Sequence, residues 1–221
     1  MTYAIITMHD EYYAEVGKLT LQNKKEYCDF HGYQLFAKVD NFSEGRHIYL
    51  DKIRHNLTIL EENPDLKWVW WLDCDAVITN FKIPMETYCN DNYNFVATVD
   101  RYALNNGSYF IKNSDRARQF LKDILALEET FVDHKWPDQQ PMISLIEYND
   151  EYRNMTKLYP QRAFNSYDYD YYYRDHGNTH DWDLFGEKGK WEPGDFVIHY
   201  PAMKHQDRLE LIKNILPKVE K

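Results

Sequence analysis

Two acidic residues, Asp73 and Asp75, directly follow a strongly apolar run at residues 67–72. Such a run predicts a buried strand, and in extended backbone side chains two residues apart project to the same side, about 6.5 Å from each other. Two carboxylates at that spacing can hold one divalent cation, or a cation bound to a diphosphate. Carboxylates at the end of a buried strand cost free energy unless they are paired or bound to a metal. The pair therefore predicts a metal site.

The same D-x-D spacing recurs at Asp168/Asp170 and at Asp181/Asp183, within a segment rich in Tyr and Asp. Neither of these pairs follows an apolar strand, so we interpret both as parts of a solvated acidic loop. A two-residue spacing is weak by itself, and the preceding strand is what distinguishes the first pair.

A phosphatase is one chemical alternative for Asp73. The string Asp73-Cys-Asp-Ala-Val-Ile78 matches the D-x-D-x-[TV]-[LIV] motif of haloacid-dehalogenase-type phosphatases, in which the leading Asp is the nucleophile. Those enzymes usually open with the motif and need a later acidic pair for Mg²⁺. Here the later candidate Asp195 is followed by His199 where a second Asp would be wanted. We favour an enzyme in which a metal-held nucleotide sugar loses its diphosphate.

The composition indicates one folded domain spanning residues 1–221, with a formal charge of −10 and 43% hydrophobic residues. A chain of this length buries a full core, and its hydrophobic content excludes a disordered protein. The sequence contains no apolar run of about 18 residues, so we expect no membrane span. Its acidic balance argues against nucleic-acid binding. Three cysteines without C-x-x-C spacing indicate reduced thiols.

Predicted strands and helices alternate along the chain. This alternation predicts an α/β fold with a largely parallel sheet, whose ligands bind at the carboxyl ends of the strands. Residues 159–193 lose periodicity and are predicted to form a long functional loop. Strands are predicted at residues 4–7, 33–39, 67–72, 94–99, 108–111 and 196–199, and helices at 12–31, 49–63, 114–127 and 139–147, with a final helix that carries Leu209, Ile212 and Leu216.

The string WVWWLDCDAVITN, with the preceding IYLDKIRHNLTILEENP, resembles the D-x-D region of glycosyltransferase family 34. That family comprises galactosyl and mannosyl transferases of fungi and xyloglucan xylosyltransferases of plants. The resemblance implies a GT-A fold and retaining transfer of galactose, mannose or xylose from a UDP- or GDP-sugar to a glycan hydroxyl, with Mn²⁺ or Mg²⁺ as cofactor. Four further segments resemble the family in the same order: KKEYCDFHGYQLF (24–36), LNNGSYFIKNS (104–114), PDQQPMISLI (137–146) and FVIHYPAMK (196–204).

Carried over to this sequence, the resemblance implies that Asp73, Asp75 and His199 hold the metal that bridges the donor diphosphate. One imidazole with two carboxylates is a chemically sensible set for Mn²⁺. Lys204, five residues after His199, is expected to place a positive charge on the leaving diphosphate; an ordinary surface lysine is the alternative. For Lys52, the same role and an ordinary surface lysine are equal alternatives.

Further donor-binding residues are expected at Thr7, Cys74, Asn106 and Gly107. Thr7 ends the first predicted strand, and Cys74 lies between the two acids. A glycine at position 107, just before a predicted strand, lets the backbone approach a ligand closely, and Asn106 can donate to and accept from sugar hydroxyls. A plain turn is the alternative.

Asp138 and Gln139 are the expected catalytic residues, because the matching family segment lies beside the transferred sugar. Asp138 also stands where a helix is predicted to begin, and a simple N-cap is the alternative. In a retaining transfer, either residue can stabilise the oxocarbenium-like centre opposite the leaving group, or attack it. The sequence leaves these two routes open. The leaving diphosphate can itself accept the proton of the acceptor hydroxyl.

The Tyr-rich residues 167–182 are expected to bind the acceptor glycan, since flat aromatic faces stack on sugars; an ordered surface loop is the alternative. A catalytically dead glycan-binding module is a third hypothesis, against which the intact set of Asp73, Asp75 and His199 argues. Family members are usually anchored in the Golgi, whereas here Met1 almost abuts the first predicted strand. We expect a soluble, cytoplasmic protein, or one of the Golgi lumen if the chain is trimmed from a longer eukaryotic protein.

Overall fold

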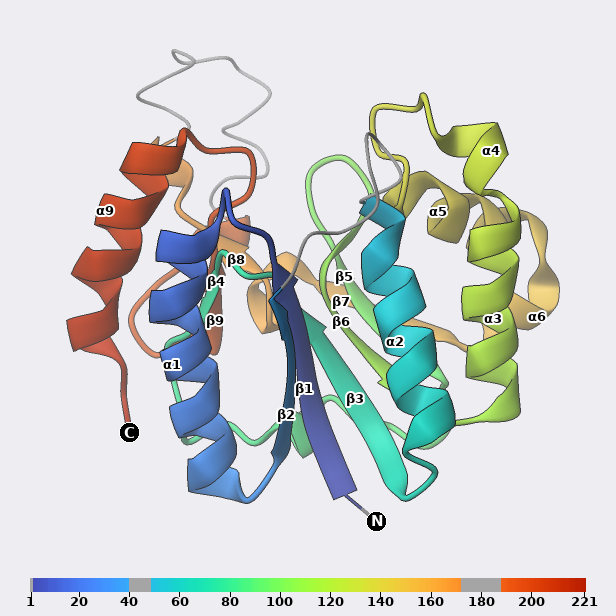
Figure 1. Ribbon diagram of the computed structural model, residues 1–221, viewed down its shortest axis with the longest axis horizontal. Helices are drawn as coiled ribbons and strands as arrows, with labels where there is room; N and C mark the ends of the chain where they lie inside the picture. The colour runs from blue at the N-terminus through green and yellow to red at the C-terminus, as the bar shows by residue number, and fades with distance from the viewer. Residues whose placement is uncertain (1, 40–48, 172–187) are drawn as a thin grey trace.

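The computed structural model describes residues 2–39, 49–171 and 188–221 (Figure 1). Its central strands span Thr2–His9 (β1), Gln34–Val39 (β2), Leu66–Leu72 (β3), Phe95–Val99 (β5), Leu104–Lys112 (β6) and Thr156–Pro160 (β7). They form a six-stranded sheet in the order β2-β1-β3-β6-β5-β7. Strand β6 runs antiparallel to β3 and β5, and the other neighbouring strands are parallel. The predicted α/β fold with a largely parallel sheet is confirmed.

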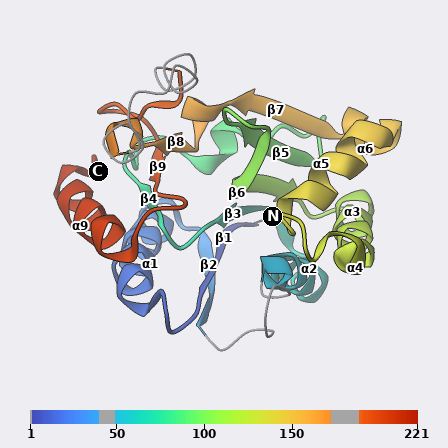
Figure 2. The same ribbon diagram turned by 90° about the horizontal axis from the view of Figure 1, so that it is seen from above.

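Helices cover both faces of this sheet. Figures 1 and 2 show α1 (Ala14–His31) and α9 (His205–Ile215) on one face, and α2 (Asp51–Glu62), α3 (Asp115–Ala126) and α5 (Gln139–Tyr148) on the other. Short helices and 3₁₀ turns lie at Met85–Thr87, Glu128–Phe131 (α4), Asp150–Asn154 (α6), Gln161–Ala163 and Leu216–Lys218. None of the helices in the described ranges is long and apolar enough to cross a bilayer.

The helix boundaries follow local signals in the sequence. Helix α1 ends at Gly32, whose φ of 74° is the left-handed conformation that glycine adopts without strain. Helix α2 ends at Asn63, immediately before Pro64. Helix α3 begins after Ser114, whose Oγ accepts a hydrogen bond from the backbone N–H of Ala117 at 3.2 Å. These predicted boundaries are confirmed to within two residues.

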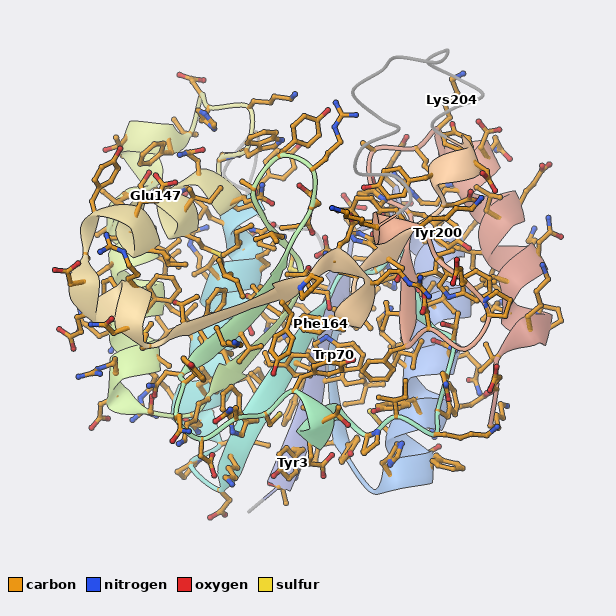
Figure 3. The ribbon with its side chains drawn as sticks, turned by 180° about the vertical axis from the view of Figure 1, so that it is seen from behind. Tyr3, Trp70, Glu147, Phe164, Tyr200 and Lys204 are labelled. Atoms are coloured by element: carbon orange, nitrogen blue, oxygen red, sulfur yellow. The ribbon has the colours of Figure 1, made fainter. Side chains whose placement is uncertain are left out.

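Strand β3 is buried on both faces, which explains why its sequence is apolar without alternation. Val69 and Trp71 contribute to a core with side chains of α2 and α3, whereas Trp68 and Trp70 contribute to a second core with side chains of α1. Figure 3 shows Trp70 near Phe164, which belongs to the same second core. The end of β3, where Asp73 follows, is therefore anchored from both sides.

A second, three-stranded sheet contains β4 (Ala76–Ile78), β8 (Ser166–Tyr167) and β9 (Val197–His199), in the order β4-β9-β8. The pairing of β4 with β9 is antiparallel and sets Ala76 opposite His199. The sequence predicted β9 but neither of its partners. Both partners are very short, and pairing with β9 stabilises segments that carry no periodic pattern of their own.

Two predictions about local structure are wrong. The predicted loop at 159–193 contains the end of β7, a 3₁₀ turn and β8; β7 pairs with β5, and β8 pairs with β9. Residues 172–187 lie outside the described residues. The strand predicted at 108–111 begins at Leu104. Asn106 and Gly107 therefore lie inside β6, and the plain turn considered for them does not occur.

Candidate active site

Asp73, Asp75 and His199 converge where β3 and β9 end. One ligand atom from each of the three lies within 4.8 Å of the other two. Asp73 and Asp75 were expected in extended backbone that continues β3, but the structure places them in a turn. In this turn the backbone N–H of Ala76 donates to the carbonyl of Asp73 at 3.1 Å. In this turn one oxygen of each carboxylate lies within 4.8 Å of the other, so the two acids can still hold one cation.

The β4–β9 pairing places His199 against the two acids. Its Nε2 lies 3.1 Å from Asp75 Oδ1 and 3.9 Å from Asp73 Oδ2, and the side chain is only 2% exposed. Two carboxylates and one imidazole form a donor set that suits a divalent cation between the hard and borderline classes. Among the described residues, this trio is the group of His, Cys, Asp and Glu side chains that fits a metal. These are the three ligands expected from the sequence, and their role stays a prediction.

A second group of charges adjoins the trio. Lys52 on α2 places its Nζ 2.8 Å from Asp138 Oδ2 and 3.5 Å from Asp73 Oδ1. Asn106 Nδ2 also donates to Asp138 Oδ2 at 2.8 Å, while the Asn106 N–H donates to Gln139 Oε1 at 3.1 Å. Lys52 therefore connects the proposed metal-binding acids to the proposed catalytic pair.

Two of the simpler alternatives fail at this group. Lys52 is 9% exposed and ion-paired, so it is no ordinary surface lysine. Asp138 precedes α5, but its side chain makes no capping hydrogen bond and binds Lys52 and Asn106 instead. Burial alone would lower the pKa of Lys52, but attraction to Asp138 and Asp73 outweighs it and holds that pKa above its usual value.

Arg208 balances the charge of Asp75 from the other side. This nearly buried side chain on α9 places its Nε 3.2 Å from Asp75 Oδ2 and donates to the carbonyl of Tyr200 at 3.0 Å. Burial raises the pKa of Asp75, but His199 and Arg208 more than offset this effect and hold it below its usual value. Sequence reasoning missed Arg208, because it lies on the predicted C-terminal helix, 133 positions from Asp75, with no pattern to set it apart.

A polar stripe on α1 holds the acidic turn from behind. Thr20 Oγ1 donates to the carbonyl of Cys74 at 2.5 Å, and Lys24 Nζ donates to the carbonyl of Ala76 at 2.8 Å. The Asn23 amide bonds both the N–H and the carbonyl of Ile78, at 2.8 and 2.9 Å. These contacts connect one face of α1 to Cys74 in the turn and to Ala76 and Ile78 of β4. Three polar residues on the buried face of α1 were the available signal, and the sequence analysis did not use it.

Gly107 makes room for neighbouring side chains. A Cβ built at this position would lie 2.3 Å from His199 Cε1 and 3.0 Å from Asp73 Oδ2. The glycine was expected to let the backbone approach a ligand, and the space it leaves is filled by two of the proposed metal ligands. Its carbonyl also accepts from the N–H of Asp73 at 2.8 Å.

Two cavities meet at these charges. The smaller is about 280 Å³ and the larger about 450 Å³, and Tyr49, Lys52 and Asp73 line both. The smaller cavity is otherwise lined by Met8, His9, Asp10, Tyr13, Trp71, Cys74 and Asp75. The larger one also reaches Asn106, Gly107, Asp138, Gln139 and His199, with Tyr102, Trp136, Tyr167 and Tyr169 among its aromatic walls.

Thr7 and Lys204 are the expected site residues that line neither cavity in the described part of the chain. Thr7 is buried within β1. Lys204 is exposed just before α9, and Figure 3 shows it, beyond Tyr200, at the end of the molecule opposite Tyr3. The structure brings the remaining expected residues into one site.

A model of the galactosyl transferase GMA12/MNN10 family matches residues 5–89 and 81–208. The chain is 24% identical to an alpha-1,2-galactosyltransferase of Schizosaccharomyces pombe, over 68% of this chain and 50% of the relative. It is 30% identical to xyloglucan 6-xylosyltransferase 4 of Arabidopsis thaliana, over 42% of this chain and 20% of the relative. The match to each relative therefore spans half of that protein or less.

Solved structures share the fold at low identity. A glycosyltransferase involved in the glycosylation of the major capsid of PBCV-1 aligns with a TM-score of 0.75 and 16% identity, over 97% of this chain and 100% of that one. The galactosyltransferase LgtC, solved with donor and acceptor sugar analogues, aligns with a TM-score of 0.57 and 16% identity, over 96% of each chain. The expected GT-A fold is confirmed.

Proposed function

Because the chain belongs to the galactosyl transferase GMA12/MNN10 family, we propose that it is a glycosyltransferase that uses a nucleotide sugar. The proposed reaction moves galactose, xylose or mannose from a UDP- or GDP-sugar to a glycan hydroxyl with retention of the anomeric configuration. The relatives support galactose and xylose, since they are a galactosyltransferase and a xylosyltransferase. Mannose rests on the sequence resemblance.

The observation that carries the proposal is the position of Asp73. This carboxylate lines both cavities, stands beside Asp75 and His199, and ion-pairs with Lys52. A donor whose nucleoside occupies the smaller cavity and whose sugar occupies the larger one would have its diphosphate at this junction. A divalent cation held by Asp73, Asp75 and His199, with Mn²⁺ as our choice, would supply the positive charge that the diphosphate requires.

Lys52 and Asn106 orient Asp138 at the proposed sugar position. Both contacts use Asp138 Oδ2, so Oδ1 takes part in neither of them. A carboxylate held in this way can stabilise positive charge at the anomeric carbon, or attack that carbon, at little cost of reorganisation. Gln139 accepts from the Asn106 N–H and lines the same cavity. Both routes left open by the sequence remain compatible with this arrangement.

The aromatic wall of the larger cavity supports a glycan acceptor. Tyr102 and Trp136 lie with ring centroids 5.6 Å apart at a tilt of 54°. Tyr167 and Tyr169 line the same cavity. Aromatic faces of this kind pack against the C–H faces of sugars. Of the segment 167–182 expected to bind the acceptor, residues 172–182 lie outside the described residues.

The competing phosphatase hypothesis lacks support at its second acidic position. Asp195 is engaged by Arg162, with Nη2–Oδ1 at 2.9 Å and Nε–Oδ2 at 3.0 Å. It is absent from the group of candidate metal ligands found among the described residues. Family membership also favours the transferase.

The experiment is thermal unfolding with UDP- and GDP-sugars, each with and without Mn²⁺, followed by product analysis with oligosaccharide acceptors. A ligand that binds only the native state raises the midpoint by mass action. We expect a Mn²⁺-dependent rise with one nucleotide class, and a product with the same anomeric configuration as the donor. Phosphate release from simple esters with Mg²⁺, without any shift by nucleotide sugars, would overturn the proposal.

A further inference from the structure

A continuous series of side-chain hydrogen bonds, which becomes buried toward its end, reaches His199 from the loop between β5 and β6. It begins at Asp100, whose Oδ1 accepts from the backbone N–H groups of Tyr102 and Ala103 at 2.8 and 3.2 Å. Asp100 Oδ2 accepts from Asn105 Nδ2 at 3.2 Å. The series therefore starts at a carboxylate held by backbone donors.

The orientation of the Asn105 amide follows from a backbone group. The N–H of Gly107 can only donate, and it lies 2.9 Å from Asn105 Oδ1. The same oxygen accepts from Asn165 Nδ2 at 2.9 Å. Asn165 Nδ2 also donates to Thr98 Oγ1 at 3.1 Å. Asn165 donates both of its amide hydrogens, to Asn105 and to Thr98. Its carbonyl oxygen therefore points away from these two residues.

That oxygen lies 2.8 Å from His199 Nδ1. An amide oxygen only accepts, so the hydrogen of this bond belongs to Nδ1. A neutral imidazole with its hydrogen on Nδ1 has its lone pair on Nε2. Nε2 faces Asp75 and Asp73 and lies within hydrogen-bond distance of Asp75 Oδ1, at 3.1 Å, so without a metal Asn165 and Asp75 compete for the hydrogen of the neutral ring. In the opposite tautomer, a hydrogen on Nε2 would point at Asp75 and occupy the direction a metal needs.

We propose that Asn165 is a positioning residue that keeps the His199 hydrogen on Nδ1 and so makes Nε2 available as a metal ligand. The inference rests on the proposed divalent-metal site and adds a residue to it. Asn165 is fully buried, so water does not compete for its contacts. A histidine that binds a metal commonly donates its other N–H to such a partner, which orients the ring.

The sequence holds no local sign of this contact. Asn165 and His199 are 34 residues apart and meet because β8 pairs in parallel with β9, with Tyr167 opposite His199. The short strand β8 begins one residue after Asn165.

The test compares Asn165→Leu and Asn165→Asp in the full chain. Leu removes the acceptor for Nδ1–H, whereas Asp retains one. Mn²⁺ affinity is measured from the electron paramagnetic resonance signal of the free ion. We expect Asn165→Leu to weaken Mn²⁺ binding by about 10- to 100-fold, the usual cost of losing such a partner, and Asn165→Asp to bind more tightly than Asn165→Leu. Equal affinities in the wild type and Asn165→Leu would overturn the inference.

Asn113→Leu is the matched control. Asn113 Nδ2 donates to the carbonyls of Leu60 and Asn63, both at 3.1 Å, beyond the opposite end of β6 from the site. This variant should lose thermal stability while keeping wild-type Mn²⁺ affinity. If it weakened Mn²⁺ binding as much as Asn165→Leu does, the effect would be one of general stability and the inference would fail.

A second readout needs neither metal nor activity. Long-range ¹H–¹⁵N spectra of metal-free protein, recorded where the ring is neutral, report which nitrogen carries the hydrogen, and His199→Gln assigns the signal. We expect Nδ1–H in the wild type and a shift toward Nε2–H in Asn165→Leu. A wild-type hydrogen on Nε2 would overturn the inference. Failure of wild-type protein to bind Mn²⁺ would instead count against the proposed metal dependence, and the spectra would still decide the role of Asn165.

Discussion

Lys52 and Asp138, which are 86 positions apart in the sequence, form an ion pair of 2.8 Å at the junction of the two cavities. Each side chain is about one-tenth exposed, at 11% and 10%. Lys52 also reaches Asp73 at 3.5 Å, so a single ammonium group serves carboxylates of both proposed functions.

Removing one partner of the pair should lower the free energy of unfolding more than removing both partners. Lys52→Met leaves the buried Asp138 carboxylate, and the partly buried Asp73 carboxylate, without their cation. Removing one partner of a buried pair typically destabilises by about 3–5 kcal/mol. In the double variant Lys52→Met/Asp138→Asn, one of those charges is also gone, so we expect part of the stability to return. Urea unfolding of the wild type, Lys52→Met, Asp138→Asn and the double variant measures the coupling. Additive losses would show that the pair does not interact as the structure indicates.

Gly107→Ala should impair metal binding more than it impairs folding. The added methyl would meet the His199 ring at 2.3 Å, so the ring must move from its place beside the acids. We expect at least about a tenfold loss of Mn²⁺ affinity, as for other disturbances of a metal ligand. Isothermal titration calorimetry measures the affinity directly.

Gly32→Ala provides the comparison for that variant. Gly32 has a φ of 74°, and a methyl group added there would have no heavy atom within 4 Å, so the substitution strains the backbone alone. It should cost about 1 kcal/mol of stability and leave Mn²⁺ binding unchanged. Wild-type Mn²⁺ affinity in Gly107→Ala would contradict the role assigned to that glycine.

Lys24 should make the stability of the metal-free protein depend on pH. Burial lowers the pKa of Lys24 to about 8 from its usual 10.5, partly offset by nearby acidic groups. Between these values the unfolded chain binds the proton more tightly, so the contribution of Lys24 to stability rises with pH. Below pH 8 the penalty for holding a charged lysine is complete, at about 3 kcal/mol by the usual conversion.

The measurement is the difference in unfolding free energy between wild type and Lys24→Met from pH 7 to 11. Tyrosines and cysteines that titrate in this range are common to both proteins and cancel. We expect the wild type to gain stability relative to the variant as the pH rises from about 8 to 10.5. A flat difference would mean that Lys24 keeps an ordinary pKa.

His199→Ala should separate an enzyme from a binding module. Loss of the imidazole removes one of three proposed ligands, so the Mn²⁺-dependent rise in midpoint and the transfer of sugar should both disappear. Far-ultraviolet circular dichroism should stay unchanged, because the side chain ends a three-residue strand. Retained transfer with full metal response would remove His199 from the site.

Much of the fold followed from local patterns in the sequence. Apolar runs marked β1, β3 and β5, and Gly32, Pro64 and Ser114 marked helix boundaries that the structure confirms. These features depend on backbone preferences and on burial of neighbouring residues, which act over a few positions. Segments stabilised by pairing with distant strands, such as β4 and β8, were missed.

The residues of the candidate site also fall into those that the sequence could indicate and those that it could not. Asp73, Asp75, His199, Asp138 and Gln139 could be named from spacing and resemblance, because each lies in a recognisable segment. Arg208, Asn165 and the polar stripe of α1 could not, since each matters only through a partner elsewhere in the chain.

By itself, the sequence determined the class of fold and the order of its main elements, and it predicted which residues bind a cation. The tertiary structure decided how they meet. It placed the D-x-D residues in a turn and set His199 against them through β4 and β9. It also placed Gly107 where a side chain would collide with the His199 ring, and set the carbonyl oxygen of Asn165 against His199 Nδ1. The physical reason is that hydrogen bonds and ion pairs act over a few ångströms, and only strand pairing brings residues distant in sequence within that range.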